Sequence, residues 1–272
     1  MKRLGAAVAL VLGLAALGAP PALAAPDGPG VSGGSTQAAI GIDVSWPQCG
    51  QSLPADRAFG IIGVNGGKAN TTNPCLADQL RWAVGSRGGT FQSTVQLYVN
   101  TGNPGGSAPS SPWPSGGSTP YGTCNGSDSL ACAWQYGWDR AMEDMAVRLA
   151  PAAQAAGLMT APTAYTWWLD VETGNTWQSD TAPNRADLEG MAAAFRHEGV
   201  RAGVYSSPYM WREIVGTVDS LSPLYGLNSW LPGAISLKGA VANCGLDPLT
   251  AGGRVVLTQY TTDLDYNYSC SG

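Results

Sequence analysis

Residues 166–172 have the sequence Thr-Trp-Trp-Leu-Asp-Val-Glu, an aromatic and aliphatic run that ends in two carboxylates. With a Thr-Gly-Asn turn behind it, the run predicts a buried strand that leaves the core into a loop. Because side chains alternate along a strand, we expect Asp170 and Glu172 on the same side, with Cα atoms roughly 7 Å apart. Two acids this close have their proton affinities pushed apart, as an acid/base pair requires. On spacing alone, ordinary solvated loop acids remain the alternative.

The start of the chain has the pattern of a secretory signal. Lys2 and Arg3 precede a long apolar run, which is followed by the small-residue stretch Ala22-Leu23-Ala24. We therefore expect residues 1–25 to be a signal peptide and residues 26–37, rich in Gly, Ser and Pro, to be a flexible leader. Residues 38–272 then suffice for one barrel or large α/β domain. The mature protein is expected to be secreted to the cell wall, without a membrane anchor.

Charge and residue scarcity exclude several classes of protein. The net charge is −5 and only 12% of residues are charged, which argues against nucleic acid or an anionic membrane surface as a partner. His197 is the single histidine, so zinc peptidases and Ser-His-Asp or Cys-His mechanisms are excluded. No Walker loop or dinucleotide fingerprint is present. No cofactor and no metal are therefore expected.

The six cysteines indicate three disulfide bonds in an exported chain. No C-x-x-C pair exists, so a zinc cluster is disfavoured. Six cysteines allow 15 pairings. The pairs expected are those that close a loop between neighbouring elements, namely Cys49–Cys75, Cys124–Cys132 and Cys244–Cys270.

The apolar pattern alternates between short strands and helices. The ranges predicted as strands are 39–45, 58–64, 94–99, 166–172, 200–207, 224–230, 255–260 and 263–267, and those predicted as helices are 74–87, 133–156, 184–198 and 208–215. Repeated β–α units at this length predict a parallel α/β barrel of the TIM type, in which the last three strands need not be parallel. Residues 100–131, rich in Gly, Ser and Pro, are expected to form an ordered flap.

Acidic residues recur at the predicted strand ends. Asp43, Asp170, Glu172 and Asp265 all lie there, and in such barrels the chemistry sits at the carboxyl ends of the strands. We therefore expect the four acids to converge on one site. Aromatic faces suit the apolar faces of sugar rings, although each aromatic taken alone is more simply explained by core packing. The candidates for sugar contacts are Tyr205, Trp177, Tyr260 and Trp230.

Four motifs together resemble the family 25 glycoside hydrolases, bacterial and phage lysozymes that cut between N-acetylmuramic acid and N-acetylglucosamine. These motifs are Gly-Ile-Asp-Val-Ser at 41–45, Leu-Asp-Val-Glu at 169–172, Gly-Val-Tyr-Ser-Ser at 203–207, and Gln-Tyr at 259–260 with Asp-Tyr-Asn at 265–267. The resemblance runs over nearly the whole mature chain. It implies an irregular barrel of about five β/α units plus three further strands.

The resemblance also implies residue roles. Glu172 would donate a proton to the glycosidic oxygen, and Asp170 would steady the 2-acetamido group of the sugar as an internal nucleophile. Asp43 and Asp265 would line the same cleft, with Tyr205 and Asn267 in the pocket. Two strand ends depart from the family. Residues 98–101 read Tyr-Val-Asn-Thr where the family has a Tyr-His-Phe-like end, and residues 64–67 read Val-Asn-Gly-Gly where it often has Lys-Ala-Thr-Glu.

Two functions follow as hypotheses. The first is a secreted, monomeric glycoside hydrolase acting on peptidoglycan or a related amino-sugar polymer. The alternative is a non-catalytic wall-binding or carbohydrate-binding domain that keeps the barrel and the acidic cleft. A weaker idea is a divalent cation held by the acids, since calcium prefers oxygen ligands, but no calcium-loop spacing is present.

Overall fold

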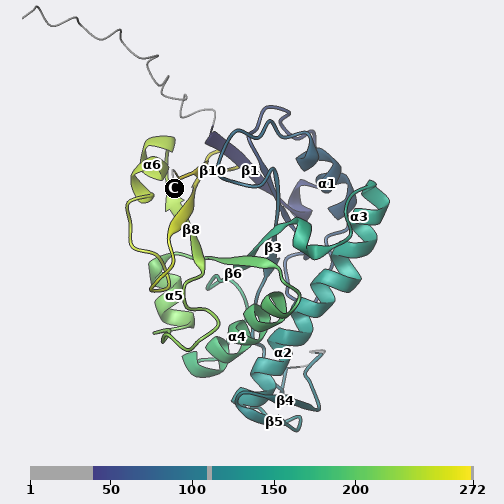
Figure 1. Cartoon of the computed structure of the whole chain (residues 1–272), viewed down its shortest axis with the longest axis vertical. Helices are drawn as coiled ribbons and strands as arrows, with labels where there is room; N and C mark the ends of the chain where they lie inside the picture. The colour runs from purple at the N-terminus through teal and green to yellow at the C-terminus, as the bar shows by residue number, and fades with distance from the viewer. Residues whose placement is uncertain (1–38, 109–111, 271–272) are drawn as a thin grey trace, which may run out of the picture. The chain divides into compact units, whose positions relative to one another are not determined.

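Eight strands close into a barrel in the computed structural model, which describes residues 39–108 and 112–270 (Figure 1). The predicted signal peptide (1–25) and leader (26–37) lie outside these residues. Around the barrel the strands follow one another in chain order and are β1 (Ile40–Val44), β2 (Gly60–Gly63), β3 (Val95–Asn100), β6 (Thr166–Asp170), β7 (Arg201–Tyr205), β8 (Asn228–Ala234), β9 (Val255–Thr261) and β10 (Asp265–Ser269).

Neighbouring strands from β1 to β9 are parallel, and β10 closes the ring antiparallel to both β9 and β1. The predicted α/β barrel is therefore confirmed. The antiparallel last strand matters for the site, because its first residue lies at the same end of the barrel as the last residues of the parallel strands.

Helices follow β2, β3, β6, β7 and β8. They are α1 (Leu76–Val84), α2 (Leu130–Glu143) continued by a π-helix η3 (Asp144–Leu149) and α3 (Ala150–Ala156), then α4 (Thr181–His197), α5 (Pro208–Ile214) and α6 (Leu237–Asn243); two short 3-10 turns, η2 (Trp46–Gln48) and η4 (Pro162–Ala164), complete the set. The predicted helix over 133–156 is thus interrupted by a π-helical segment. The structure places α6 where the sequence predicted no helix, and β8 begins four residues later than predicted.

Alternation along β6 separates two cores. Trp167 and Leu169 point outward and pack between the sheet and its helices. Trp168 points inward and packs with Tyr205 and Trp230 in the barrel interior. The next inward residue after Trp168 is Asp170 at the end of the strand, so the aromatic layer supports a polar layer above it.

Helices α2 and α4 cross closely because each has a glycine at the contact. A Cβ built on Gly137 would lie 1.9 Å from the Asp187 carbonyl oxygen, and one on Gly190 would lie 1.9 Å from the Trp134 carbonyl oxygen. Any side chain there would collide with backbone that cannot move aside. Sequence reasoning gave these glycines no role.

The predicted flap over 100–131 is only partly a separate loop. Asn100 belongs to β3 and Leu130 begins α2. Between them the hairpin of β4 (Gly117–Thr119) and β5 (Gly122–Cys124) packs on α2 (Figure 1). Tyr121 at its turn donates a hydrogen bond to the Glu189 carboxylate on α4. These contacts attach the hairpin to the helical layer.

Three disulfides join the cysteine pairs named from the sequence. The S–S distances of Cys49–Cys75, Cys124–Cys132 and Cys244–Cys270 are 2.03, 1.98 and 2.01 Å. A search of the described helices finds none with the length and apolar character needed to cross a membrane.

Candidate active site

The four acids predicted from the sequence line one pocket at the carboxyl end of the parallel strands. Its volume is about 300 Å³. The lining residues are Asp43, Tyr98, Asp170, Glu172, Tyr205, Trp230, Gln259, Thr261 and Asp265. No lysine or arginine is among them, so the pocket gathers negative charge without a neutralising cation.

Asp43 and Asp265 meet through strand register. They are direct partners across the antiparallel β1–β10 pair, a position in which like charges repel. Burial and the neighbouring Asp265 raise the pKa of Asp43 to about 8, although hydrogen bonds to its carboxylate act in the opposite direction. Those bonds come from the amides of Asn267, at 2.6 Å, and Gln259, at 3.0 Å. Asp43 is therefore mainly protonated at neutral pH.

Asp170 is the last residue of β6 and is only 4% exposed. Burial raises its pKa well above the usual value, and the charges of Glu172 and Asp43 raise it further. The Asn100 amide, across the parallel β3–β6 register, donates a 2.7 Å hydrogen bond to Asp170 Oδ2 and favours the ionised form. Asp170 Oδ1 is buried and has no hydrogen-bond partner among the described residues.

Glu172 lies two residues beyond the end of β6, in the turn rather than on the predicted strand. It is half-buried, and burial together with the charge of Asp265 raises its pKa. No described residue donates a hydrogen bond to its carboxyl group, in contrast to Asp170. The Asn100 amide favours the charge on Asp170, although burial and the charge of Glu172 act more strongly in the opposite direction on the pKa of Asp170.

Aromatic residues form the floor of the pocket. The rings of Tyr205 and Trp230 lie 4.4 Å apart between centroids, and Tyr98 meets Trp230 edge-on at 6.4 Å. The Tyr205 hydroxyl donates a 2.8 Å hydrogen bond to the Gln259 side chain, which in turn holds Asp43. Tyr205 and Trp230, both predicted as sugar contacts, thus lie in the pocket.

Three other predicted contacts do not line this pocket. The Trp177 indole donates to the Glu172 carbonyl oxygen at 2.8 Å and packs against the outer core. Tyr260 points away from the barrel interior, because its neighbour Gln259 points inward, and it stacks on Tyr266. Asn267 is fully buried and orients Asp43 instead of reaching the pocket surface.

Sequence reasoning missed Tyr98, Gln259, Thr261 and Asn100. Each is a residue of β3 or β9 that faces the barrel interior. Because side chains alternate along a strand, one residue known to face inward would have identified them. The sequence alone does not show which residue of each strand faces inward. Among residues 39–108 and 112–270, no three His, Cys, Asp or Glu side chains are grouped so as to hold a metal ion.

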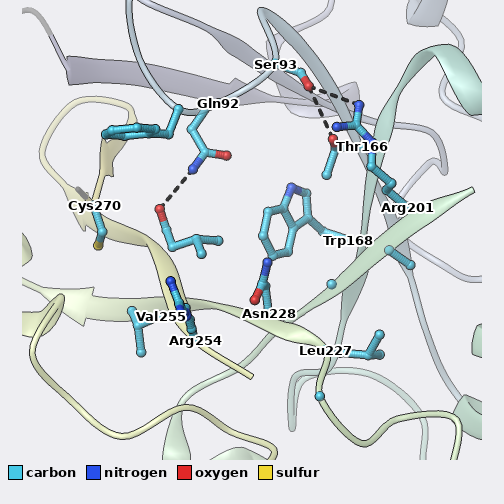
Figure 2. Close-up of a pocket in the computed structure, with 15 residues that line it drawn as sticks. Gln92, Ser93, Thr166, Trp168, Arg201, Leu227, Asn228, Arg254, Val255 and Cys270 are labelled. Carbon is cyan, nitrogen blue, oxygen red and sulfur yellow. Dashed lines mark hydrogen bonds between the residues drawn. The ribbon is translucent and has the colours of Figure 1, made fainter. Parts of the chain in front are cut away.

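A larger cavity, of about 410 Å³, lies at the amino end of the parallel strands. Figure 2 shows Trp168 within it, with Arg201 directed toward Ser93 and Thr166. Arg201 is the first residue of β7 and Arg254 immediately precedes β9, and no acid is among the residues that line this cavity. The two ends of the barrel interior therefore carry opposite charge.

Sequence comparison finds a match over the segment that carries two of the four acids, Asp170 and Glu172. A family model described as Lysozyme-like protein 1 matches residues 156–230, which include Asp170, Glu172 and Tyr205. Lysozyme-like protein 5 of Caenorhabditis elegans is 45% identical over 51 residues. Over this segment the chain is similar to lysozyme-like proteins. That match covers 19% of this chain and only 23% of the worm protein.

The barrel fold is also seen in solved structures. A muramidase from Trichobolus zukalii superposes with a TM-score of 0.52 at 16% identity, over 86% of this chain and 94% of that one. A bacterial lysozyme from Streptomyces coelicolor gives 0.51 at 14% identity, over 86% and 92%. At these identities the likeness shows a common fold. The resemblance to lysozymes stated from the sequence motifs is confirmed.

Proposed function

We propose that the protein is a glycoside hydrolase that cleaves glycosidic bonds in a bacterial cell-wall polymer of the peptidoglycan type. The observation that carries the proposal is the single pocket in which Asp170 and Glu172 meet Asp43 and Asp265 above an aromatic floor. Glycoside hydrolysis needs one protonated carboxyl and a second group that stabilises positive charge on the sugar ring. The lysozyme-like sequence signature and the muramidase fold support an amino-sugar polymer as the substrate.

Glu172 is proposed as the general acid. Its carboxyl is half-buried at the pocket mouth, where a substrate can reach it, and its pKa is raised by burial and by Asp265. A carboxyl with a raised pKa keeps its proton closer to neutral pH and can donate it to a leaving oxygen.

Asp170 is proposed to assist the substrate acetamido group. Its Oδ2 is held by Asn100, and its Oδ1 has no partner among the described residues. An ionised Oδ1 can accept a hydrogen bond from the acetamido N–H and so direct the acetamido oxygen at the anomeric carbon. The carboxyl groups of Asp43 and Asp265 line the same pocket, and whichever of them is ionised favours positive charge developing on the ring.

The proposed reaction proceeds in two balanced steps. In the first, the acetamido oxygen forms a bond to C1 while the C1–O glycosidic bond breaks, and the leaving oxygen takes the proton of Glu172. In the second, a water molecule attacks C1 and breaks the temporary C1–O bond, and its proton returns to the Glu172 carboxylate. The sugar gains a hydroxyl with net retention, and the enzyme is restored.

The three disulfides support an oxidising compartment as the place of action, since such bonds persist outside the cytoplasm. Together with the predicted signal peptide, they favour a secreted enzyme that meets its polymer in the cell wall.

The test is the release of reducing ends from purified peptidoglycan. Glu172→Gln should lower the rate by at least about 100-fold, because it removes the transferable proton. Glu213→Gln, on the exposed face of α5, is the matched control and should leave the rate unchanged. Circular dichroism would verify that both variants fold.

Two results would contradict the proposal. Undiminished activity of Glu172→Gln would remove Glu172 from the role of acid. A wild-type protein that binds the polymer in titrations but releases no reducing ends at any pH would instead be a non-catalytic wall-binding domain.

A further inference from the structure

A buried ion pair outside the acid pocket lies at the start of the π-helix η3. Asp144 is fully buried, and its Oδ1 accepts hydrogen bonds from Arg148 Nη1 and Asn65 Nδ2, both at 2.8 Å. Arg148 is only 2% exposed and also bonds Glu143 and the Thr71 carbonyl oxygen. Burying a charged group costs desolvation free energy, and π-helical segments are frequent at functional sites. We therefore asked what function this ion pair serves.

Asn65 connects Asp144 to the barrel. It follows β2, is fully buried, and its Oδ1 accepts a 2.7 Å hydrogen bond from the backbone N–H of Asn100. Asn100, the last residue of β3, then donates its side-chain amide to Asp170 Oδ2 at 2.7 Å. Hydrogen bonds therefore run without a break from the helical layer to the proposed catalytic pair.

We propose that Asp144 is a positioning residue for Asp170, acting through Asn65 and Asn100. An amide side chain has one donor end and one acceptor end. By accepting from Asn65 Nδ2, the Asp144 carboxylate turns Asn65 Oδ1 toward the Asn100 N–H. This fixes the end of β3 and presents the Asn100 amide to Asp170, the bond that favours the ionised form of Asp170.

Other titratable groups surround both Asp144 and Asp170, the two ends of this chain of hydrogen bonds. Asp144 faces Arg148 and Arg140, and Glu143 is the other carboxylate bonded to both arginines. Burial raises the pKa of Asp144 to about 7, opposed chiefly by Arg148. The titratable groups that face Asp170 are Glu172 and Asp43.

The inference rests on the proposed function for its kinetic readout only. Asp144→Ala should lower kcat about tenfold with KM within about twofold, a size typical of residues that orient a functional group from behind. It should also raise the pKa of the Asp170 carboxyl in a carbon-13 NMR titration, because the Asn100 donor is no longer held in place. Asp144→Asn keeps an acceptor oxygen for Asn65 and should stay within about threefold of wild type.

Two further variants separate positioning from general stability. Glu143→Ala removes the other carboxylate bonded to Arg148 but has no contact with Asn65, so it should leave kcat and the Asp170 titration unchanged. Asn65→Ala breaks the next link and leaves the Asp144–Arg148 pair intact, so it carries the test if Asp144→Ala does not fold. If Asp144 acts through Asn65, the Asp144→Ala/Asn65→Ala double variant should lose no more activity than Asn65→Ala alone.

The inference is overturned if Asp144→Ala and Asn65→Ala titrate Asp170 as Glu143→Ala does, or if the losses of the double variant add. Failure of the proposed function would look different. In that case wild type would release no reducing ends, while the Asp170 titration would still decide whether Asp144 positions it.

Discussion

At the carboxyl end of the barrel four carboxyl groups line one pocket, whereas the cavity at the amino end carries Arg201 and Arg254 and no acid. The charged residues at the two ends also differ in how far they are buried. Asp170 is buried and Asp43 is half-buried, and burial together with repulsion from neighbouring acids raises their pKa values. The two arginines are exposed to solvent. Acids with strongly raised pKa values cluster at functional sites, where residues are kept for their chemistry although they lower stability. Such acids are found here at the carboxyl end of the barrel only.

Asp170→Asn should have the largest effect at the carboxyl end. An amide cannot supply the negative charge that the proposed mechanism needs beside the acetamido group, so kcat should fall by about 10²–10³-fold. Arg201→Gln, at the amino end of the neighbouring strand, is the control and should remain within about twofold. Reducing-end assays measure both. Equal losses in the two variants would show that the two ends do not differ in function.

Asp43→Asn should stabilise the protein at neutral pH. Because the folded pKa of Asp43 is raised from 3.8 to about 8, its unfolded form loses its proton more readily, and this acid opposes folding increasingly as pH rises from about 4 to 8. Asparagine keeps an acceptor oxygen for Asn267 and Gln259. We expect the free energy of unfolding to rise by about 1–3 kcal/mol at pH 7.

Urea unfolding at pH 7 and pH 4 measures this gain, which should shrink at the lower pH. Exposed Asp247→Asn is the control and should change stability by less than about 0.5 kcal/mol. A destabilised Asp43→Asn variant at pH 7 would mean that the carboxylate contributes more through its hydrogen bonds than it costs through burial.

Asp265→Asn should move the pH profile of activity. The charge of Asp265 raises the pKa of Glu172, so removing it lets Glu172 lose its proton at lower pH. The decline of kcat/KM on the alkaline side should therefore shift to lower pH. Asp263→Asn, two residues earlier in an exposed turn, should leave the profile in place. A shift toward higher pH would contradict Glu172 as the acid.

The smallest effect is expected at the amino end. Arg254→Ala should change the free energy of unfolding by less than about 0.5 kcal/mol and leave activity unaltered, because an exposed side chain without an acidic partner contributes little. Thermal and urea unfolding would measure it. A decrease in the free energy of unfolding above about 1 kcal/mol would show that Arg254 in this cavity contributes to the stability of the fold.

Local sequence patterns predicted much of the fold and of the site. The apolar runs located the eight strands of the barrel, and acids at their ends predicted the convergence of Asp43, Asp170, Glu172 and Asp265. The local patterns failed to predict which of two neighbouring residues on a strand faces the barrel interior. Tyr260 was chosen as a sugar contact, but its neighbour Gln259 faces inward, because a shift of one residue along a strand exchanges the two faces.

The sequence by itself indicated the order of the barrel strands, the three cysteine pairs and the residues at each strand end, because these depend on neighbours along the chain. The tertiary structure alone decided that Asp43 lies opposite Asp265, that Asn100 meets Asp170, and that Asp144 reaches Asn65 from the helical layer. Those contacts depend on how the ring of strands closes. Closure and register are set by packing between distant segments, which no local pattern encodes.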